Sequence, residues 1–401
     1  MHTDSAAQTV AVAGAEFGWG SSGKLSAILS ALQERSPVPL RFVGLATGLG
    51  RPLLSAHSVD RWYDLPADDA PGAVREIAHS ERVRAAVVVL DGLTATALEA
   101  SGVPTVFVDS LPFMWTEGDR AALPLDAAVY CAQKCIELPP ECLEVLASVR
   151  ALRWVDAVIG TPPPAVGRTA ARPFRSALVN LGGLRAPRLA DWTNYPRAVV
   201  PAVLEALAAY GVHEVHLAGN LPADLAGRLV DATLAPSRTT SGALTHGEFL
   251  DRLADCDVLL TSPGLTTLLE AGAVGVPTVC LPPQNLSQIF NGRFHSQSVG
   301  VDVRVVWPKD VLVEEEALAL RSQGEDHALE LIYGGVAAAA AAAAGGRRAG
   351  AALRDGVLTA LRRSAAEGTD WGALTSTVGT GGAAQVADIL LTTLRGASPP
   401  A

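Results

Sequence analysis

The chain has 401 residues, of which 49% are hydrophobic, and this length suffices for two domains that each bury their own core. Its formal net charge of -10 argues against nucleic acid as a main partner, because nucleic-acid-binding domains carry basic patches. A negatively charged substrate must therefore be attracted by local cations and not by the overall charge.

Apolar runs and helical stripes alternate through the first half of the chain. This alternation is typical of a parallel sheet with helices on both faces. Leu25, Ile28, Leu29 and Leu32 recur at helical spacing and predict a helix over Lys24–Gln33. The other predicted elements are strands at Val10–Ala13, Leu40–Leu45, Ala85–Leu90, Thr105–Val108 and Val155–Ile159, and helical segments ending near Pro104 and over Leu143–Val149.

The cysteines and the N-terminus indicate the compartment. Cys131, Cys135 and Cys142 are interpreted as buried thiols on one helical face, because a zinc site needs a fourth ligand and usually CxxC pairs. The odd number of cysteines, 5, favours a reducing compartment. Met1–Gln8 lacks the basic and apolar regions of a signal peptide, and Val336–Ala344 is too short to span a bilayer. We expect a cytoplasmic enzyme without a membrane partner; oligomers remain possible.

Three consecutive prolines, Pro162 to Pro164, are the clearest break in the chain and predict a stiff hinge or linker. We therefore predict domains over 1–168 and 169–382, with a last helix over 383–395. The elements predicted beyond the break are strands at Ser176–Leu181, Glu214–Ala218, Asp257–Thr261 and Thr278–Leu281, and helices at Val199–Tyr210, Gly247–Leu253, Asp326–Leu361 (interrupted at Gly345-Gly346) and Ala383–Leu394.

The segment Cys256–Gln297 carries the strongest functional signal. A strand, a Ser-Pro-Gly loop, a helix, a second strand and a polar Gln/Asn loop follow one another. Backbone amides at such a helix start can hold a diphosphate, and Glu270, one turn later, can accept hydrogen bonds from ribose hydroxyls. An ordinary βαβ unit with a solvated Glu270 would leave the polar loop unexplained. The candidate binding residues here are Gly264, Thr266, Thr267, Glu270, Gln284, Asn285 and Gln288.

This order of features resembles the donor half of the GT-B glycosyltransferases, including the transferase that adds N-acetylglucosamine in peptidoglycan synthesis. Pro263 departs from the pattern, since a small residue is usual there. The resemblance implies an α/β fold of GT-B type, with two Rossmann-like domains whose parallel sheets face across a cleft. It implies an acceptor-binding first domain, a UDP-sugar-binding second domain and a last helix that packs back on the first. A UDP-sugar would be a substrate, and neither a cofactor nor a metal is expected. The matching residues are Gly264, Thr267, Glu270, Gly275, Pro277, Gln284 and Gln288.

Three further loops are implicated by the resemblance. The Gly-rich loop from Glu16 to Lys24 would touch donor phosphate and acceptor, and a second loop after Asn180 would lie against the diphosphate. Gly18 to Lys24 also fits a P-loop, but Leu25 stands where a P-loop needs Ser or Thr. The third loop, at Leu244, would lie near the nucleobase. The candidate residues in the three loops are Gly20, Ser21, Ser22, Gly182, Gly183, Arg185 and Leu244.

Inverting sugar transfer needs a base that takes the acceptor proton. The histidine that is familiar in the first loop of the family is missing here, and Glu16 lies at about that position. Asp109 and Asp91 follow parallel strands at the edge where such folds bind ligands. We predict Glu16 first and Asp109 second; a turn or helix-capping role is the alternative for Asp91 and Asp109.

The segments VAVAGAEFGWGSSGKLSAIL and LRFVGLATGLGRPLL more narrowly resemble the cytosylglucuronate synthases and their hydroxymethylcytosine relatives of nucleoside antibiotic biosynthesis. This resemblance implies glucuronic acid transfer from UDP-glucuronate to N1 of cytosine, with Lys24, Arg51 or Arg293 meeting the donor carboxylate. An O-glycosyltransferase for another natural product, a sugar-nucleotide epimerase and a binding protein without turnover remain alternatives.

Overall fold

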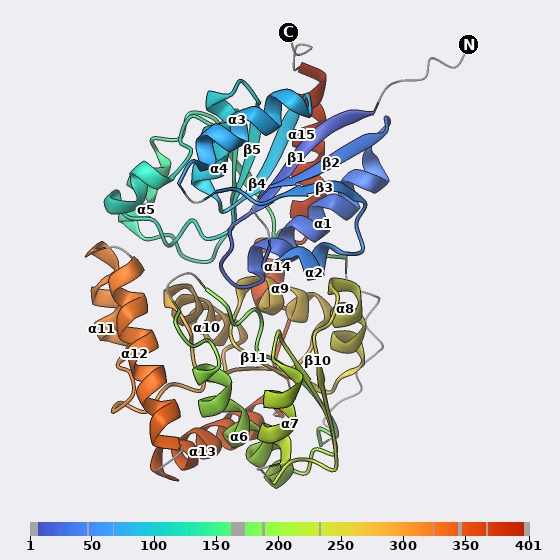
Figure 1. The fold of residues 1–401 in the computed structure, drawn as a ribbon. Coiled ribbons are helices and arrows are strands. Elements are labelled where there is room, and N and C mark those ends of the chain that lie inside the picture. The colour runs from blue at the N-terminus through green and yellow to red at the C-terminus, as the bar shows by residue number, and fades with distance from the viewer. Residues whose placement is uncertain are drawn as a thin grey trace. The chain divides into compact units, whose positions relative to one another are not determined.

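The computed structural model describes residues 7–45, 48–66, 68–161, 173–186, 189–231, 234–323, 325–343, 347–365 and 368–396. The chain divides into two compact units, a first unit of 1–161 with 378–401 and a second unit of 162–377. Each unit is a sheet with helices on its faces (Figure 1). The domain boundary predicted at 168/169 lies outside the described residues.

The first unit contains a seven-stranded sheet in the order β3-β2-β1-β4-β5-β6-β7. All neighbouring strands are parallel. The strands are β1 (Gln8–Gly14), β2 (Leu40–Leu45), β3 (Val59–Tyr63), β4 (Ala85–Val89), β5 (Thr105–Asp109), β6 (Val129–Gln133) and β7 (Leu152–Val155). The helices are α1 (Gly20–Arg35), α2 (Arg51–Leu54), α3 (Ala70–Ser80), α4 (Gly92–Ala100), the 3-10 helix η1 (Glu117–Ala122), α5 (Pro140–Leu146) and α15 (Gly382–Gly396).

Alternating side chains of β1 face two separate cores. Val10 and Val12 pack with residues of α1 and α15, whereas Ala11 and Ala13 pack with residues of α3 and α4. These two pairs of helices lie on opposite faces of the sheet (Figure 1). This follows from the two-residue period of a strand. Both faces of the sheet are covered, which is why its central strands read as continuous apolar runs.

The segment after β7 fastens α15 to the first unit. We predicted a strand over Val155–Ile159, but β7 ends at Val155, so this prediction is wrong. The backbone of the next residues bonds elsewhere: Asp156 N–H donates to Gln385 Oε1 at 2.8 Å, and Ala157 N–H donates to Gly379 O at 3.1 Å. These bonds replace a strand ladder with contacts to the start of α15.

Substituting Gly382 with alanine is expected to destabilise the first unit by about 2 kcal/mol, since overpacking a tight site forces the backbone to shift. An added Cβ at Gly382 would lie 2.2 Å from the carbonyl oxygen of Asp156. Urea unfolding of the variant measures the effect. Gly396→Ala is the matched control at the other end of α15, where no atom lies within 4 Å of the added Cβ. Equal midpoints for the two variants would contradict the prediction.

The second unit contains a five-stranded sheet in the order β10-β9-β8-β11-β12, again with parallel neighbours. The strands are β8 (Ser176–Asn180), β9 (Glu214–Ala218), β10 (Arg238–Gly242), β11 (Val258–Thr261) and β12 (Thr278–Cys280). The helices are α6 (Asn194–Tyr210), α7 (Ala223–Asp231), α8 (His246–Asp255), α9 (Leu265–Val274), α10 (Leu286–Val299), α11 (Glu314–Ala319), the 3-10 helix η2 (Arg321–Gln323), α12 (Glu325–Ala343), α13 (Arg347–Ser364) and α14 (Ala373–Val378).

Several sequence predictions need correction. The three cysteines do not share a helical face, because Cys131 lies on β6, Cys135 follows that strand and Cys142 lies in α5. The strands β3, β6 and β10 were not predicted. The predicted break at Gly345-Gly346 lies outside the described residues. No helix within the described ranges has both the length and the apolar content needed to cross a bilayer.

Candidate functional site

The candidate donor site is at the carboxyl edge of the second sheet, where the strand order reverses. From β8 the sheet continues to β9 on one side and to β11 on the other. In open α/β sheets this switch point is where ligands bind. Asn180 and Thr261 are paired in the last register of β8 and β11, and Ser262 N–H donates to Asn180 O at 3.0 Å.

Helix α9 begins at this edge and brings Glu270 to it. Gly264 is the N-cap residue, and its position supplies no side-chain capping bond. The first turn of such a helix presents backbone donors and a positive dipole end, which suits a diphosphate. Thr266 is 7% exposed and the Glu270 side chain, one turn later, 2% exposed. The Oγ1 of Thr267 accepts a hydrogen bond from Asn180 Nδ2 at 3.2 Å.

Gln284 lies in the loop after β12 and connects it to the loops after β8 and β11. Its Nε2 donates to Ser262 Oγ at 2.8 Å and to Leu181 O at 3.3 Å. The side chain is therefore oriented by the loops after β8 and β11. The motif placed Gln284 at the site, but it did not show that this residue also holds the loops in place.

The polar loop after β12 ends at Asn285 and is shorter than we predicted. Helix α10 starts at Leu286, and Asn285 Oδ1 caps it by accepting from Gln288 N–H at 3.0 Å. Gln288 Oε1 in turn accepts from Gln284 N–H at 2.8 Å. The side-chain oxygens of Asn285 and Gln288 thus make structural bonds, whereas the amide nitrogens that we predicted as donors take no part in these bonds. The polar residues are explained by helix capping. This role was not predicted, because no apolar stripe follows the cap to indicate a helix.

Asn291 is a site neighbour that the sequence analysis missed. It lies in α10 with 1% of its surface exposed, and its Nδ2 donates to Pro263 O at 3.0 Å. This bond connects the Ser-Pro-Gly loop to α10. Its burial inside a helix is the only feature that marks Asn291, and burial cannot be read from the sequence.

The loop after β8 is built on a positive backbone angle. Gly182 has φ 70°, a conformation that glycine adopts without strain, and its N–H donates to Asn180 Oδ1 at 3.0 Å. Gly183 follows in the same loop, half-buried. Arg185 is exposed, and its guanidinium carbon lies 5.2 Å from the centre of the Trp192 ring. This stacking supports the guanidinium through its flat face.

The candidate nucleobase loop connects β10 to α8. Leu244 is partly buried against a cluster that includes Leu178 and Leu253. Thr245 caps α8 in a capping box with Glu248. The next residue is His246, and its Nε2 lies 2.7 Å from Glu270 Oε1. This contact joins residues that are 24 positions apart and has no local sequence signature.

In the first unit, the Gly-rich loop is shorter than we predicted. Helix α1 begins at Gly20 and not at Lys24, so Gly20, Ser21 and Ser22 form its first turn. The serines are 3% and 4% exposed, and Gly20 is exposed. The N-cap residue Trp19 supplies no side-chain capping bond.

The three acidic candidates have different surroundings. Glu16 is exposed, and its Oε1 accepts from Gly48 N–H at 2.6 Å. Asp91 is the N-cap of α4, with Oδ1 accepting from Thr94 N–H at 3.0 Å, which is the capping role weighed as its alternative. Asp109 is 0% exposed.

The carboxyl of Asp109 is enclosed by donors from its own unit. Leu111 N–H donates to Oδ1 at 2.9 Å, while Trp115 Nε1 and Tyr130 Oη donate to Oδ2 at 2.7 and 2.8 Å. Burial raises the pKa of Asp109 to about 6, although these three bonds favour the charged form and lower it. The geometry is that of a buried structural carboxyl.

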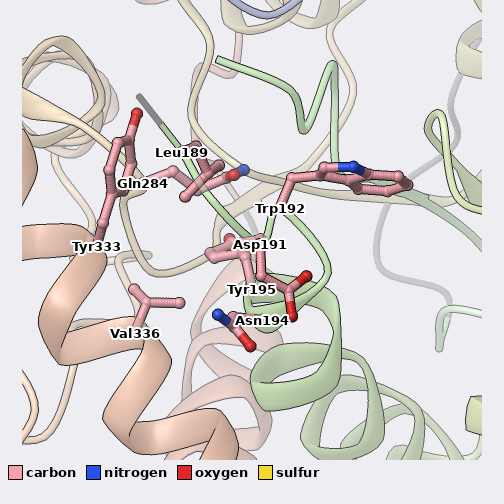
Figure 2. A pocket seen from close by; sticks show the side chains of 8 residues that line it. All are labelled: Leu189, Asp191, Trp192, Asn194, Tyr195, Gln284, Tyr333 and Val336. Atoms are coloured by element: carbon pink, nitrogen blue, oxygen red, sulfur yellow. The ribbon is translucent and has the colours of Figure 1, made fainter. Parts of the chain in front are cut away.

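A small pocket opens beside Gln284 in the second unit (Figure 2). Its polar groups come from the start of α6, from α12 and from Gln284. Asp191 accepts from Thr193 N–H at 2.9 Å and pairs with Arg197 at 3.3 Å. The hydrogen bond from the Thr193 hydroxyl, more than any other contact, keeps the pKa of Asp191 below its usual value. The lining residues are Leu189, Asp191, Trp192, Asn194, Tyr195, Gln284, Tyr333 and Val336.

The cations considered for a donor carboxylate have other contacts here. Arg51 pairs with Asp64 and lies over Trp62 at 5.4 Å. Arg293 pairs with Glu314 at 3.0 Å and Glu315 at 2.9 Å. Lys24 is 2% exposed within α1. A carboxylate that binds Arg51 or Arg293 has to replace an existing partner.

No protein-family model matches the sequence, and a search of curated proteins finds no match. Solved structures with a similar fold include MurG of Acinetobacter baumannii, with 13% identity, 96% of this chain and 99% of that chain covered and a TM-score of 0.50. S. aureus MnaA with UDP has 12% identity, 94% of each chain covered and a TM-score of 0.54.

Arabidopsis thaliana UGT89C1 complexed with UDP has 14% identity to this chain, with 97% of this chain and 99% of that chain covered and a TM-score of 0.52. Identities this low concern the fold and not the chemistry. The coverage extends over both sheets. The chain therefore has an α/β fold of the GT-B type, with one parallel sheet of seven strands and one of five.

Proposed function

We propose that the protein is a glycosyltransferase that uses a UDP-sugar and a small-molecule acceptor. The observation that carries this proposal is Glu270, a buried carboxylate one turn into a helix that starts without a side-chain cap at the switch point of the sheet. The structures of MnaA and UGT89C1 that share this fold were both determined with UDP, which supports a uridine nucleotide as the ligand.

In this proposal the nucleotide follows the carboxyl edge of the second sheet. The diphosphate meets the start of α9, together with Gly182, Gly183 and Arg185, whose charge complements it. The ribose hydroxyls donate to Glu270, and the base lies beside Leu244. The donor sugar lies beside Gln284, whose amide suits a ring that carries hydroxyl groups.

The specific reaction that we propose is transfer of glucuronic acid to cytosine. N1 of cytosine forms a bond to the anomeric carbon as the bond from that carbon to the diphosphate oxygen breaks, which inverts the configuration and releases UDP. The N1 proton passes to a base. The sequences around the first loop support this choice of substrates. In this reaction the donor carboxylate replaces the present partner of Arg51 or Arg293.

Glu16 is the base in this proposal. Its carboxylate is exposed at the end of β1, whereas that of Asp109 has no exposed surface and is fully engaged by donors of the protein. A general base must come within hydrogen-bond distance of the proton that it removes, and Asp109 does not meet this condition.

The decisive assay measures UDP release from UDP-glucuronate with and without cytosine, with the product identified by mass. We expect cytosine-dependent release together with a cytosine glucuronide. Glu16→Gln should then lower kcat by about 100-fold or more, as loss of a general base does. UDP-glucose and UDP-N-acetylglucosamine are the comparison donors. Release only with one of these, or conversion of the donor to another sugar nucleotide, would reject the proposed substrates.

A further inference from the structure

The pair formed by His246 and Glu270 has a geometry that goes beyond a capping or packing role. Nε2 of the imidazole lies 2.7 Å from Oε1 of the carboxylate, and the two side chains are 12% and 2% exposed. Within the described part of the chain, this is the one side-chain partner that the structure gives Glu270. A buried carboxylate held by a single donor keeps acceptor capacity for a ligand.

Both partners are fixed by the packing of the helices that carry them. His246 is the first residue of α8, and the capping box between Thr245 and Glu248 fixes where that helix starts. Leu253 of α8 and Ala271 of α9 belong to one buried cluster. The imidazole therefore reaches the carboxylate from a rigid neighbouring helix and not from a loose loop.

Anchoring one oxygen restricts rotation of the carboxylate. A glutamate has three side-chain torsions, and ordering them on binding weakens affinity. With Oε1 held by Nε2–H, the plane of the carboxylate is set before a ligand arrives, and Oε2 keeps its acceptor capacity for that ligand. This is the arrangement by which a hydrogen-bonded neighbour orients a binding group.

We propose that His246 is a positioning residue for Glu270. Its Nε2–H holds the carboxylate in the orientation that accepts hydrogen bonds from the vicinal hydroxyls of a ribose. This inference rests on the proposed function, because it takes the ligand to be a uridine diphosphate. The same segment, Leu244–His246, then meets the base on one side and orients the ribose acceptor on the other.

The test compares UDP with 2′,3′-dideoxy-UDP, which keeps the base and the diphosphate but lacks both hydroxyls. Calorimetric titration should show that His246→Ala weakens UDP binding by about tenfold and leaves dideoxy-UDP binding within about twofold of wild type. In a Glu270→Ala background the same substitution should have little further effect. His246→Gln, whose amide can donate to Oε1, should restore most of the UDP affinity.

His213→Ala is the matched control, since His213 is an exposed histidine of the same unit. Thermal unfolding of each variant shows whether the fold is retained, and His246→Gln keeps the test valid if the alanine variant unfolds. Equal losses for both nucleotides would overturn the inference, because His246 would then act on the base, the phosphates or the fold. Unchanged UDP affinity would also overturn it. A wild-type protein that binds neither nucleotide would instead reject the proposed function and the inference with it.

Discussion

UDP affinity is expected to fall by about 100-fold when Glu270 is replaced with alanine, because hydrogen bonds to a charged group contribute about 1.5–3 kcal/mol each. The substitution removes the acceptor for both ribose hydroxyls at a site that is 2% exposed, where water cannot take over the bonds. Calorimetric titration with UDP measures the change. The affinity for dideoxy-UDP should fall far less.

Glu316→Ala is a suitable control for this experiment, because Glu316 is an exposed glutamate in the same unit. Glu270→Ala also leaves His246 without its carboxylate partner, so thermal unfolding must show that the variant is folded before its affinity is interpreted. If the folded variant bound UDP as tightly as wild type, Glu270 would not be the ribose acceptor and the donor site would need another assignment.

Asp109 is expected to make the stability of the first unit fall as pH rises from about 4 to about 6. Burial raises the pKa of this carboxyl from 3.8 to about 6, so the folded state binds the proton more tightly than the unfolded state does. Stability from the protonated form is fully present below the unfolded value and is lost as pH rises through the folded value. The contribution is on the order of 3 kcal/mol.

Urea unfolding of wild type and Asp109→Asn at about pH 4.5 and about pH 7.5 checks this expectation. The asparagine cannot ionise, so the stability advantage of wild type over the variant should shrink at the higher pH. A constant difference would contradict the pKa assignment. The folded variant should also keep its transfer rate within a few-fold. A loss of about 100-fold or more in kcat would instead make Asp109 the base.

The fold could be predicted from the sequence where apolar runs are uninterrupted. The strands β4 and β5, with the sequences AAVVV and TVFVD, were each predicted to within one residue, because both are buried along their whole length. The strands β3 and β10 escaped prediction because they are sheet edges with the polar sequences VDRWY and RTTSG. Helix α10 was missed because LSQIFNGRFHSQSV has no clear apolar stripe.

The candidate site could be predicted only as far as its residues are consecutive. Gly264, Thr267 and Glu270 follow one strand and open one helix, so their spacing places them together. The partner of Glu270 comes from another helix, and the amide that supports Pro263 O comes from Asn291, 28 positions away. Such contacts depend on how helices pack, which spacing along the chain does not encode.

The attachment of α15 to the first unit has a consequence for synthesis on the ribosome. The first unit needs Val386, Leu390 and Leu394 to complete the core against β1 and α1, and these residues emerge only after the whole second unit. The nascent first unit therefore carries an uncovered apolar sheet face while more than half of the protein is still being translated. The second unit is contiguous in sequence and its chain is complete first, so the unit whose translation begins first is the last to be complete.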